Sequence, residues 1–188
     1  MTSEECNYGT LISAIKFAAE KHRHQKRKDE AGSPYIIHPI EVLDLLYNEG
    51  AVRETAVLIA GVLHDTVEDT GTKPEEIKEL FGEDVMKLVM ECTDDKSLPK
   101  AERKRLQVVN ASHKSPGAKQ IKLADKISNV QDLLKAPPKD WPLERKQEYL
   151  DWSSKVVDGL RGVNPRLEEI YDRALEAGKK ALLSGSHR

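Results

Sequence analysis

The sequence AVLIAGVLHDTVEDT, at residues 56–70, decides the fold class. Its apolar residues recur every three or four positions, which is the spacing of one face of an α-helix. Two ionisable residues, His64 and Asp65, stand among these apolar positions. The stretch therefore predicts a helix that carries polar chemistry beside a buried face. That face consists of Ala56, Ile59, Ala60, Leu63 and Val67.

The same periodicity extends outward over most of the chain. Similar stripes begin near Leu11, Val85, Ile121 and Leu167. Clusters of Pro and Gly separate them, and none of these breaks is longer than a connector. Strand signals are thin, because residues 35–37 are too short a run to count. We expect an all-α protein of roughly eight to ten helices.

Length and composition fit one soluble domain. The chain has 188 residues, of which 38% are hydrophobic and 33% charged, and this length can bury one sizeable core. We expect a single domain over residues 1–188, with its core at about 10–183 and a short flexible tail at 184–188. No apolar run approaches the roughly 20 residues of a membrane span, and the N-terminus lacks a secretory pattern. A cytoplasmic location without a membrane partner is therefore expected.

Charge and cysteine usage exclude further classes. Lys and Arg number 30 against 32 Asp and Glu, a net charge of −2, so nucleic acid is not an expected partner. Cys6 and Cys92 are the only cysteines in the sequence, and neither belongs to a CxxC pair. A disulfide scaffold, a zinc knuckle and a thioredoxin-type site are thereby excluded. For assembly, we expect a monomer or a weak homo-oligomer.

A scattered set of His and Asp stands in apolar surroundings, and three or four such groups can converge on a divalent metal. Burying each of these groups costs several kcal/mol unless a hydrogen bond or an opposite charge compensates. Taken singly, His38 also fits a cap or loop, and the His64–Asp65 pair also fits a helix surface. The residues alone therefore leave open whether these groups bind a metal or have only structural roles. The set is His38, His64, Asp65 and Asp125.

Two acids follow the His-Asp pair at helical spacing. Glu68 lies four residues after His64 and Asp69 four after Asp65, so each carboxylate lies one turn from a candidate ligand. Acids beside a metal can orient and deprotonate water, and a solvated helix face is the alternative.

Because the proposed ligand set of two histidines and two aspartates has nitrogen and oxygen but no sulfur, it favours Mn²⁺, or else Fe²⁺ or Mg²⁺, over a closed structural zinc.

Basic residues gather in two clusters, which suits an anionic ligand on a nearly neutral chain. For each residue alone, a solvated, salt-bridged face is the alternative. The clusters are Arg23, Lys26, Arg27 and Lys28, and Lys96, Lys100, Arg103, Lys104 and Arg105. Three aromatic residues fit either stacking on a base or packing in the core: Tyr35, Tyr149 and Trp152. The other histidines show no partner pattern and are expected at the surface: His22, His24, His113 and His187.

The order of a distant His, a His-Asp pair and a later Asp resembles the signature of HD-domain metal-dependent phosphohydrolases. Longer strings, collinear from about residue 18 to residue 162, resemble the hydrolase domain of the RelA/SpoT family. Without a synthetase or regulatory domain, the chain looks most like the stand-alone metazoan SpoT homologues and the small alarmone hydrolases. The strings are RKDEAGSPYIIHPIEV, AGVLHDTVEDT, FGEDVMKLVMECTDDKS, ERKRLQ and KLADKISNVQDL.

This resemblance implies an all-helical HD fold with one Mn²⁺ per chain. It implies hydrolysis of the 3′-pyrophosphate of guanosine tetra- or pentaphosphate (ppGpp or pppGpp), which gives GDP or GTP plus pyrophosphate. By position, the implied metal ligands are His38, His64, Asp65 and Asp125. Glu68 and Asp69 match the acidic pair that activates water. The implied nucleotide and phosphate pocket contains Arg27, Lys28, Tyr35, Lys100, Asn129, Arg145 and Tyr149.

Three other functions compete with this one. Animal members of the same family have been associated with removal of the 2′-phosphate of NADPH, which the same site would perform. A broader HD phosphohydrolase, such as a nucleotidase or cyclic-nucleotide phosphodiesterase, is disfavoured by the Glu68–Asp69 pair and the surroundings of Tyr35. A non-catalytic nucleotide sensor would have lost a ligand or an acid, whereas all six positions are kept here.

Overall fold

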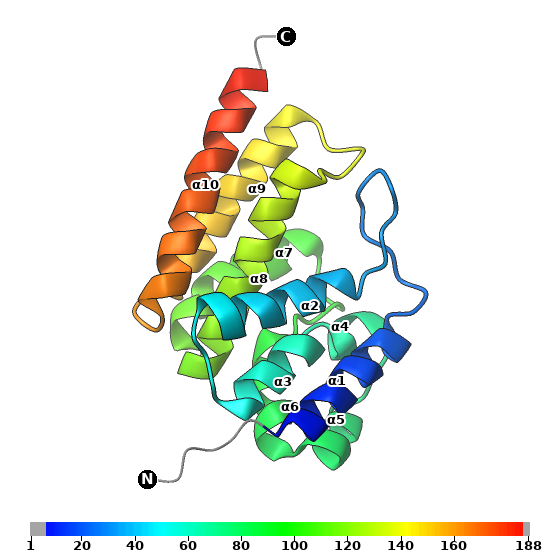
Figure 1. The fold of residues 1–188 in the computed structure, drawn as a ribbon. Coiled ribbons are helices and arrows are strands. Elements are labelled where there is room, and N and C mark those ends of the chain that lie inside the picture. Colours follow the sequence, from blue (N-terminus) through cyan, green and yellow to red (C-terminus); the bar gives the residue numbers. More distant parts are fainter. Residues whose placement is uncertain (1–6, 186–188) are drawn as a thin grey trace.

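The computed structural model describes residues 7–185 of the chain. Within that range the chain forms ten α-helices, a π-helical turn and a 3-10 turn, with no strand, so the all-α prediction is confirmed (Figure 1). The elements are α1 (Tyr8–Lys21), α2 (Ile37–Asp44), η1 (Leu45–Glu49), α3 (Thr55–Leu63), α4 (Thr66–Thr70), α5 (Pro74–Phe81), α6 (Glu83–Cys92), α7 (Lys100–Asn110), η2 (Ala111–His113), α8 (Pro116–Lys135), α9 (Leu143–Asp158) and α10 (Pro165–Gly185).

Helix α3 is a central, buried element. Residues 57–63 are all buried, and apart from Gly61 they are aliphatic. The helix packs against α1, α2 and α6. Gly61 permits a close approach to η1, because a Cβ at this position would lie only 2.6 Å from Leu46 Cδ1. This packing fixes the C-terminal end of α3, where the His-Asp pair follows.

Helix α8 runs beside α9 and α10 and also contacts α2, α3 and α6 (Figure 1). Its N-terminus is capped by Ser115, whose hydroxyl accepts from the backbone N–H of Ala118. Its buried side chains are mostly aliphatic, but four are polar: Lys122, Asp125, Lys126 and Ser128. Buried charges require partners, so this helix already marks a polar centre within the core.

The expected single helix over residues 56–70 is wrong in one respect. Helix α3 ends at Leu63 and α4 begins at Thr66, so His64 and Asp65 form a turn between two helices. The Thr66 hydroxyl donates to the Leu63 carbonyl at 2.7 Å, and such side-chain bonds compete with the helical ladder. On a continuous helix the two side chains would diverge by about 100°. The turn instead lets them face one another.

The segment between α1 and α2 folds back on itself. The backbone N–H of Arg27 donates to Ser33 at 2.8 Å, and that of Tyr35 donates to Gln25 at 3.0 Å. The Lys28 carbonyl accepts from the backbone N–H of Lys139, beyond the end of α8, at 3.2 Å. The first two bonds close the segment on itself, and the third holds Lys28 near the C-terminal end of α8.

Helix α10 continues to Gly185, so residues 184–185 of the expected tail are helical. Residues 186–188, with His187, and the N-terminal Cys6 lie outside the described part of the chain. None of the helices in the described range is both long and apolar enough to cross a membrane.

Candidate metal centre and active site

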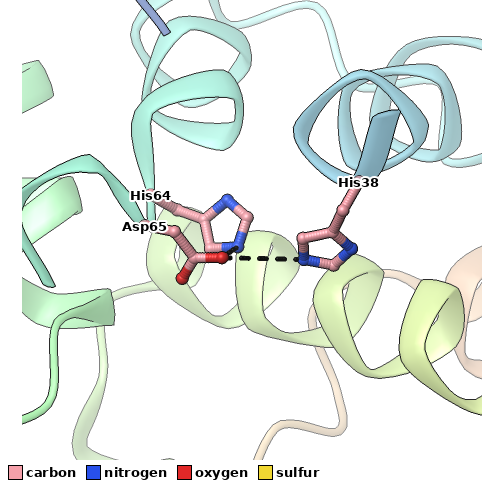
Figure 2. Close-up of side chains that lie close together, drawn as sticks. All are labelled: His38, His64 and Asp65. Atoms are coloured by element: carbon pink, nitrogen blue, oxygen red, sulfur yellow. Dashed lines mark ion pairs between the residues drawn. The ribbon is translucent and has the colours of Figure 1, made fainter. Parts of the chain in front are cut away.

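The four proposed metal ligands converge from three parts of the fold. His38 comes from α2, His64 and Asp65 from the turn after α3, and Asp125 from α8. The first three each offer an atom within 4.8 Å of the others, and Figure 2 shows both rings directed toward the carboxylate. The Nε2 atoms of His64 and His38 lie 3.0 Å and 3.7 Å from Asp65 Oδ2. They lie 3.9 Å and 3.3 Å from Asp125 Oδ1.

The orientation of His64 suits a metal ligand. Its Nδ1 lies 2.8 Å from the Gly61 carbonyl, which can only accept, so Nδ1 carries a proton. Its Nε2 is buried and has no hydrogen-bond partner of good geometry. In the neutral ring, the lone pair on Nε2 then faces the Asp65 carboxylate, and a cation between the two would stabilise this arrangement. The ligand set therefore fits a divalent ion held by nitrogen and oxygen.

The pKa shifts within the cluster also support a site for a cation. Burial opposes charge on His64, but the carboxylates of Asp65 and Asp125 raise its pKa above the usual value. Burial likewise opposes ionisation of Asp65, yet His64 and His38 lower its pKa well below the usual range. These shifts favour positive charge between the carboxylates, which a proton on His64 Nε2 supplies in the metal-free protein and which a bound divalent ion would supply in its place.

Asp125 is held by three neighbours on its own helix. Lys122 and Lys126 place their ammonium groups 3.4 Å and 3.2 Å from Oδ2, and Asn129 donates to Oδ1 at 2.6 Å. Although burial opposes ionisation, the two lysines keep the pKa of Asp125 well below its usual value. The carboxylate is thus fixed as an anion, with Oδ1 toward the histidines.

The acidic pair faces two different sides. Glu68 Oε2 accepts from the backbone N–H of Asp94 at 3.0 Å, and Arg103 lies 3.8 Å from Oε1. Burial, with the nearby charge of Asp65, raises the pKa of Glu68 above its usual value. Asp69 instead accepts from Gln25 at 2.8 Å and pairs with Lys96.

A cavity of about 610 Å³ adjoins the cluster. Five of the seven expected pocket residues line it: Arg27, Lys28, Tyr35, Asn129 and Tyr149. The other two, Lys100 and Arg145, do not. Burial and the positive charges of Arg145, Lys104 and Lys28 lower the pKa of Lys100, so these cations lie near one another.

Several of the lining residues already have protein partners. The Tyr35 hydroxyl donates to Asp65 Oδ2 at 2.5 Å, so this ring connects the cavity to the ligand cluster. Arg27 pairs with Asp132 on α8. The Tyr149 ring lies 5.5 Å from Trp141, and its centroid is equally far from that of Trp152. Tyr149 therefore belongs to an aromatic wall of the cavity.

His22 is not at the surface as expected, because it is only 1% exposed. Its ring lies 4.9 Å from that of Tyr35, and its Nδ1 lies 2.7 Å from Gln25 Oε1. Since Gln25 also donates to Asp69, a half-buried chain of two hydrogen bonds joins His22 to Asp69. The sequence gives no periodic signal for these contacts, which the folded-back segment creates.

Four further residues at the site were not singled out from the sequence. Lys122 and Lys126 flank Asp125 in an apolar helix, and two lysines among buried positions are a signal that sequence reasoning can use. Glu41 and Ser128 carry no such signal, because they meet only when α2 packs on α8.

The helical fold and the His-Asp cluster define the class of protein: the chain belongs to the HD domain family, which matches residues 14–151. Guanosine-3′,5′-bis(diphosphate) 3′-pyrophosphohydrolase MESH1 of Homo sapiens is 54% identical over 159 residues, which are 85% of this chain and 89% of the human protein. The protein of that name from Drosophila melanogaster is 50% identical over 162 residues, 86% of this chain and 90% of the fly protein.

A solved structure supports the same grouping. It is described as "A metazoan ortholog of SpoT hydrolyzes ppGpp and plays a role in starvation responses". It superposes with a TM-score of 0.87 at 47% sequence identity, covering 89% of this chain and 94% of the other. The resemblance to SpoT-type hydrolases that the motifs indicated is thereby confirmed.

Proposed function

We propose that this chain is a Mn²⁺-dependent ppGpp and pppGpp 3′-pyrophosphohydrolase. One observation carries the proposal: two histidines and two aspartates converge beside a cavity lined by basic and aromatic side chains. Tyr35 and Asn129 line that cavity and bond directly to Asp65 and Asp125. The human and fly relatives are named guanosine-3′,5′-bis(diphosphate) 3′-pyrophosphohydrolases, which supports the reaction at the 3′-pyrophosphate.

We propose one Mn²⁺ per chain, held by His38, His64, Asp65 and Asp125. When bound, such an ion lowers the pKa of water and offsets phosphate charge. HD-domain hydrolases use a divalent metal, and the buried, unpartnered Nε2 of His64 supports a cation at this place.

Glu68 is the proposed general base. Burial raises its pKa, which is the direction that makes a carboxylate a better base, and the Asp94 N–H fixes one of its oxygens. Water attacks the phosphorus attached to the ribose 3′ oxygen, and the bond from this phosphorus to the ribose oxygen breaks. The proton that Glu68 accepts balances the one gained by the ribose oxygen. The products are GDP and pyrophosphate, or GTP and pyrophosphate from pppGpp.

The remaining residues position the substrate. Arg27 and Lys28 line the cavity and would neutralise phosphate oxygens, with Lys100 and Arg145 adding positive charge nearby. Phosphoryl transfer depends mostly on positioning and charge stabilisation, so these groups suffice chemically. The half-buried Tyr149 offers a ring face for the base.

A substrate panel tests the proposal. With added Mn²⁺, the release of pyrophosphate and phosphate is measured for ppGpp, pppGpp, NADPH, GTP and a cyclic dinucleotide. We expect pyrophosphate from ppGpp and pppGpp, and none without a divalent metal. Phosphate from NADPH alone would instead indicate the 2′-phosphatase, and no release from any substrate would indicate a nucleotide sensor.

Domain organisation, location and assembly belong to the same proposal. We infer that the chain works as one domain in the cytoplasm, as a monomer or weak homo-oligomer, on a small nucleotide. Sedimentation of the purified chain measures the assembly directly.

A further inference from the structure

A chain of two hydrogen bonds holds the ring of His38 from behind. His38 Nδ1 lies 3.0 Å from the Ser128 hydroxyl, and that hydroxyl lies 2.9 Å from Glu41 Oε2. His38 is 1% exposed and Ser128 is 2% exposed. His38 and Glu41 belong to α2, whereas Ser128 belongs to α8, so the chain of bonds crosses between two helices.

The chemistry of the three groups sets the direction of both bonds. An ionised carboxylate only accepts, and a serine hydroxyl has one proton. Ser128 therefore donates to Glu41 and accepts from His38 Nδ1–H. In the neutral imidazole, the Nε2 of His38 then keeps its lone pair, and it faces Asp125 Oδ1 at 3.3 Å.

We propose that Ser128 and Glu41 are positioning residues of the metal site, which fix the tautomer and the ring orientation of His38. This inference rests on the proposed role of His38 as a ligand. Outer partners of this kind raise the basicity of a metal-binding imidazole, and losing one typically weakens metal binding about 10–100-fold.

Two features distinguish this arrangement from ordinary burial of a serine. A serine inside a helix commonly bonds back to a carbonyl of the preceding turn, but Ser128 directs its hydroxyl to α2. His64 is also held at Nδ1 by an acceptor, the Gly61 carbonyl. Both histidines are thus oriented alike, so that Nε2 is the atom presented to the cluster.

The test measures Mn²⁺ affinity by titration calorimetry on the full chain. Ser128→Ala removes the link, Ser128→Thr keeps the hydroxyl, and Glu41→Gln keeps an acceptor but removes the charge. Ser153→Ala is the matched control, because Ser153 is also buried and accepts a hydrogen bond from Tyr171 at 2.9 Å, outside the ligand cluster. Turnover is not the readout, since Glu41 lines the nucleotide cavity.

We expect Ser128→Ala to weaken Mn²⁺ binding about 10–100-fold, Glu41→Gln less, and Ser128→Thr and Ser153→Ala hardly at all. A second readout uses the ¹⁵N shifts of the imidazoles in the metal-free chain, at a pH where the rings are neutral. They should show the proton of His38 on Nδ1 in the wild type, and a mixture of tautomers in Ser128→Ala.

Unchanged Mn²⁺ affinity in both Ser128→Ala and Glu41→Gln would overturn the inference, and so would a proton on His38 Nε2 in the wild type. If the wild-type chain binds no Mn²⁺, the proposed function fails. The imidazole shifts then still decide whether Ser128 sets the tautomer.

Discussion

The His64 imidazole donates from Nδ1 to the carbonyl of Gly61, 2.8 Å away in the preceding turn of α3. The same glycine packs against Leu46 with no room for a Cβ, which would lie 2.6 Å from Leu46 Cδ1. One residue therefore serves both the core and the site. Its backbone orients a proposed ligand, and its missing side chain lets α3 approach η1.

Gly61→Ala should lower both stability and metal affinity. The added methyl group forces Leu46 or the helix to move, which typically costs about 1–3 kcal/mol, and the carbonyl that orients His64 moves with it. Urea unfolding measures the first effect and Mn²⁺ titration the second. Gly9→Ala in α1 is the control, because a Cβ there meets only Asn7 Oδ1 at 3.4 Å. Gly61→Ala behaving like Gly9→Ala would contradict this account.

Glu68→Gln should retain metal binding and lose turnover. The amide keeps the shape of the side chain but cannot accept a proton, and loss of a general base costs about 10²–10⁴-fold in rate. Steady-state kinetics on ppGpp, with Mn²⁺ affinity measured in parallel, separates the two effects. Wild-type turnover in this variant would show that the base assignment is wrong.

Lys28→Ala should mainly raise KM. Lys28 is exposed at the cavity, so its charge is expected to bind phosphate equally in the ground state and the transition state. The comparison is with Lys16→Ala, an exposed lysine on α1 that does not line the cavity. A KM equal to that of Lys16→Ala would remove Lys28 from the binding site.

Stability should fall at high pH because of Cys92. Burial raises the pKa of this thiol to about 12, whereas the unfolded thiol ionises at about 8.5. The thiol's contribution to the free energy of unfolding is therefore complete below the pKa of the unfolded state and is lost as the pH rises toward the pKa of the folded state. Urea midpoints at pH 8 and pH 10, in Cys6→Ser and in Cys6→Ser with Cys92→Ala, isolate the effect. Equal losses in both chains would contradict it.

The helical class and the gathering of His and Asp could be predicted because each has a local signature. The apolar spacing fixes which face of a helix is buried, and an ionisable residue such as Asp125 on that face needs a partner. The break after Leu63 could not be predicted in this way. At the break, the Thr66 hydroxyl bonds to the Leu63 carbonyl, a kind of side-chain bond that competes with the helical ladder and that apolar spacing does not reveal.

Contacts between distant segments also could not be predicted from the sequence. His22 is buried because the following segment folds back and brings Tyr35 over it. Ser128 meets Glu41 because α2 crosses α8. No spacing along the chain encodes either contact, since each depends on how two helices or a helix and a loop pack together.

The most direct test of the central claim follows the oxygen of the attacking water. Wild-type chain and Asp65→Asn are incubated with ppGpp and Mn²⁺ in H₂¹⁸O, and the products are analysed by mass spectrometry. We predict one ¹⁸O in pyrophosphate and none in GDP for the wild type, with no release in Asp65→Asn or without metal. Release of orthophosphate, label in the ribose of GDP, or full activity of Asp65→Asn would contradict metal-dependent attack on the 3′-phosphorus.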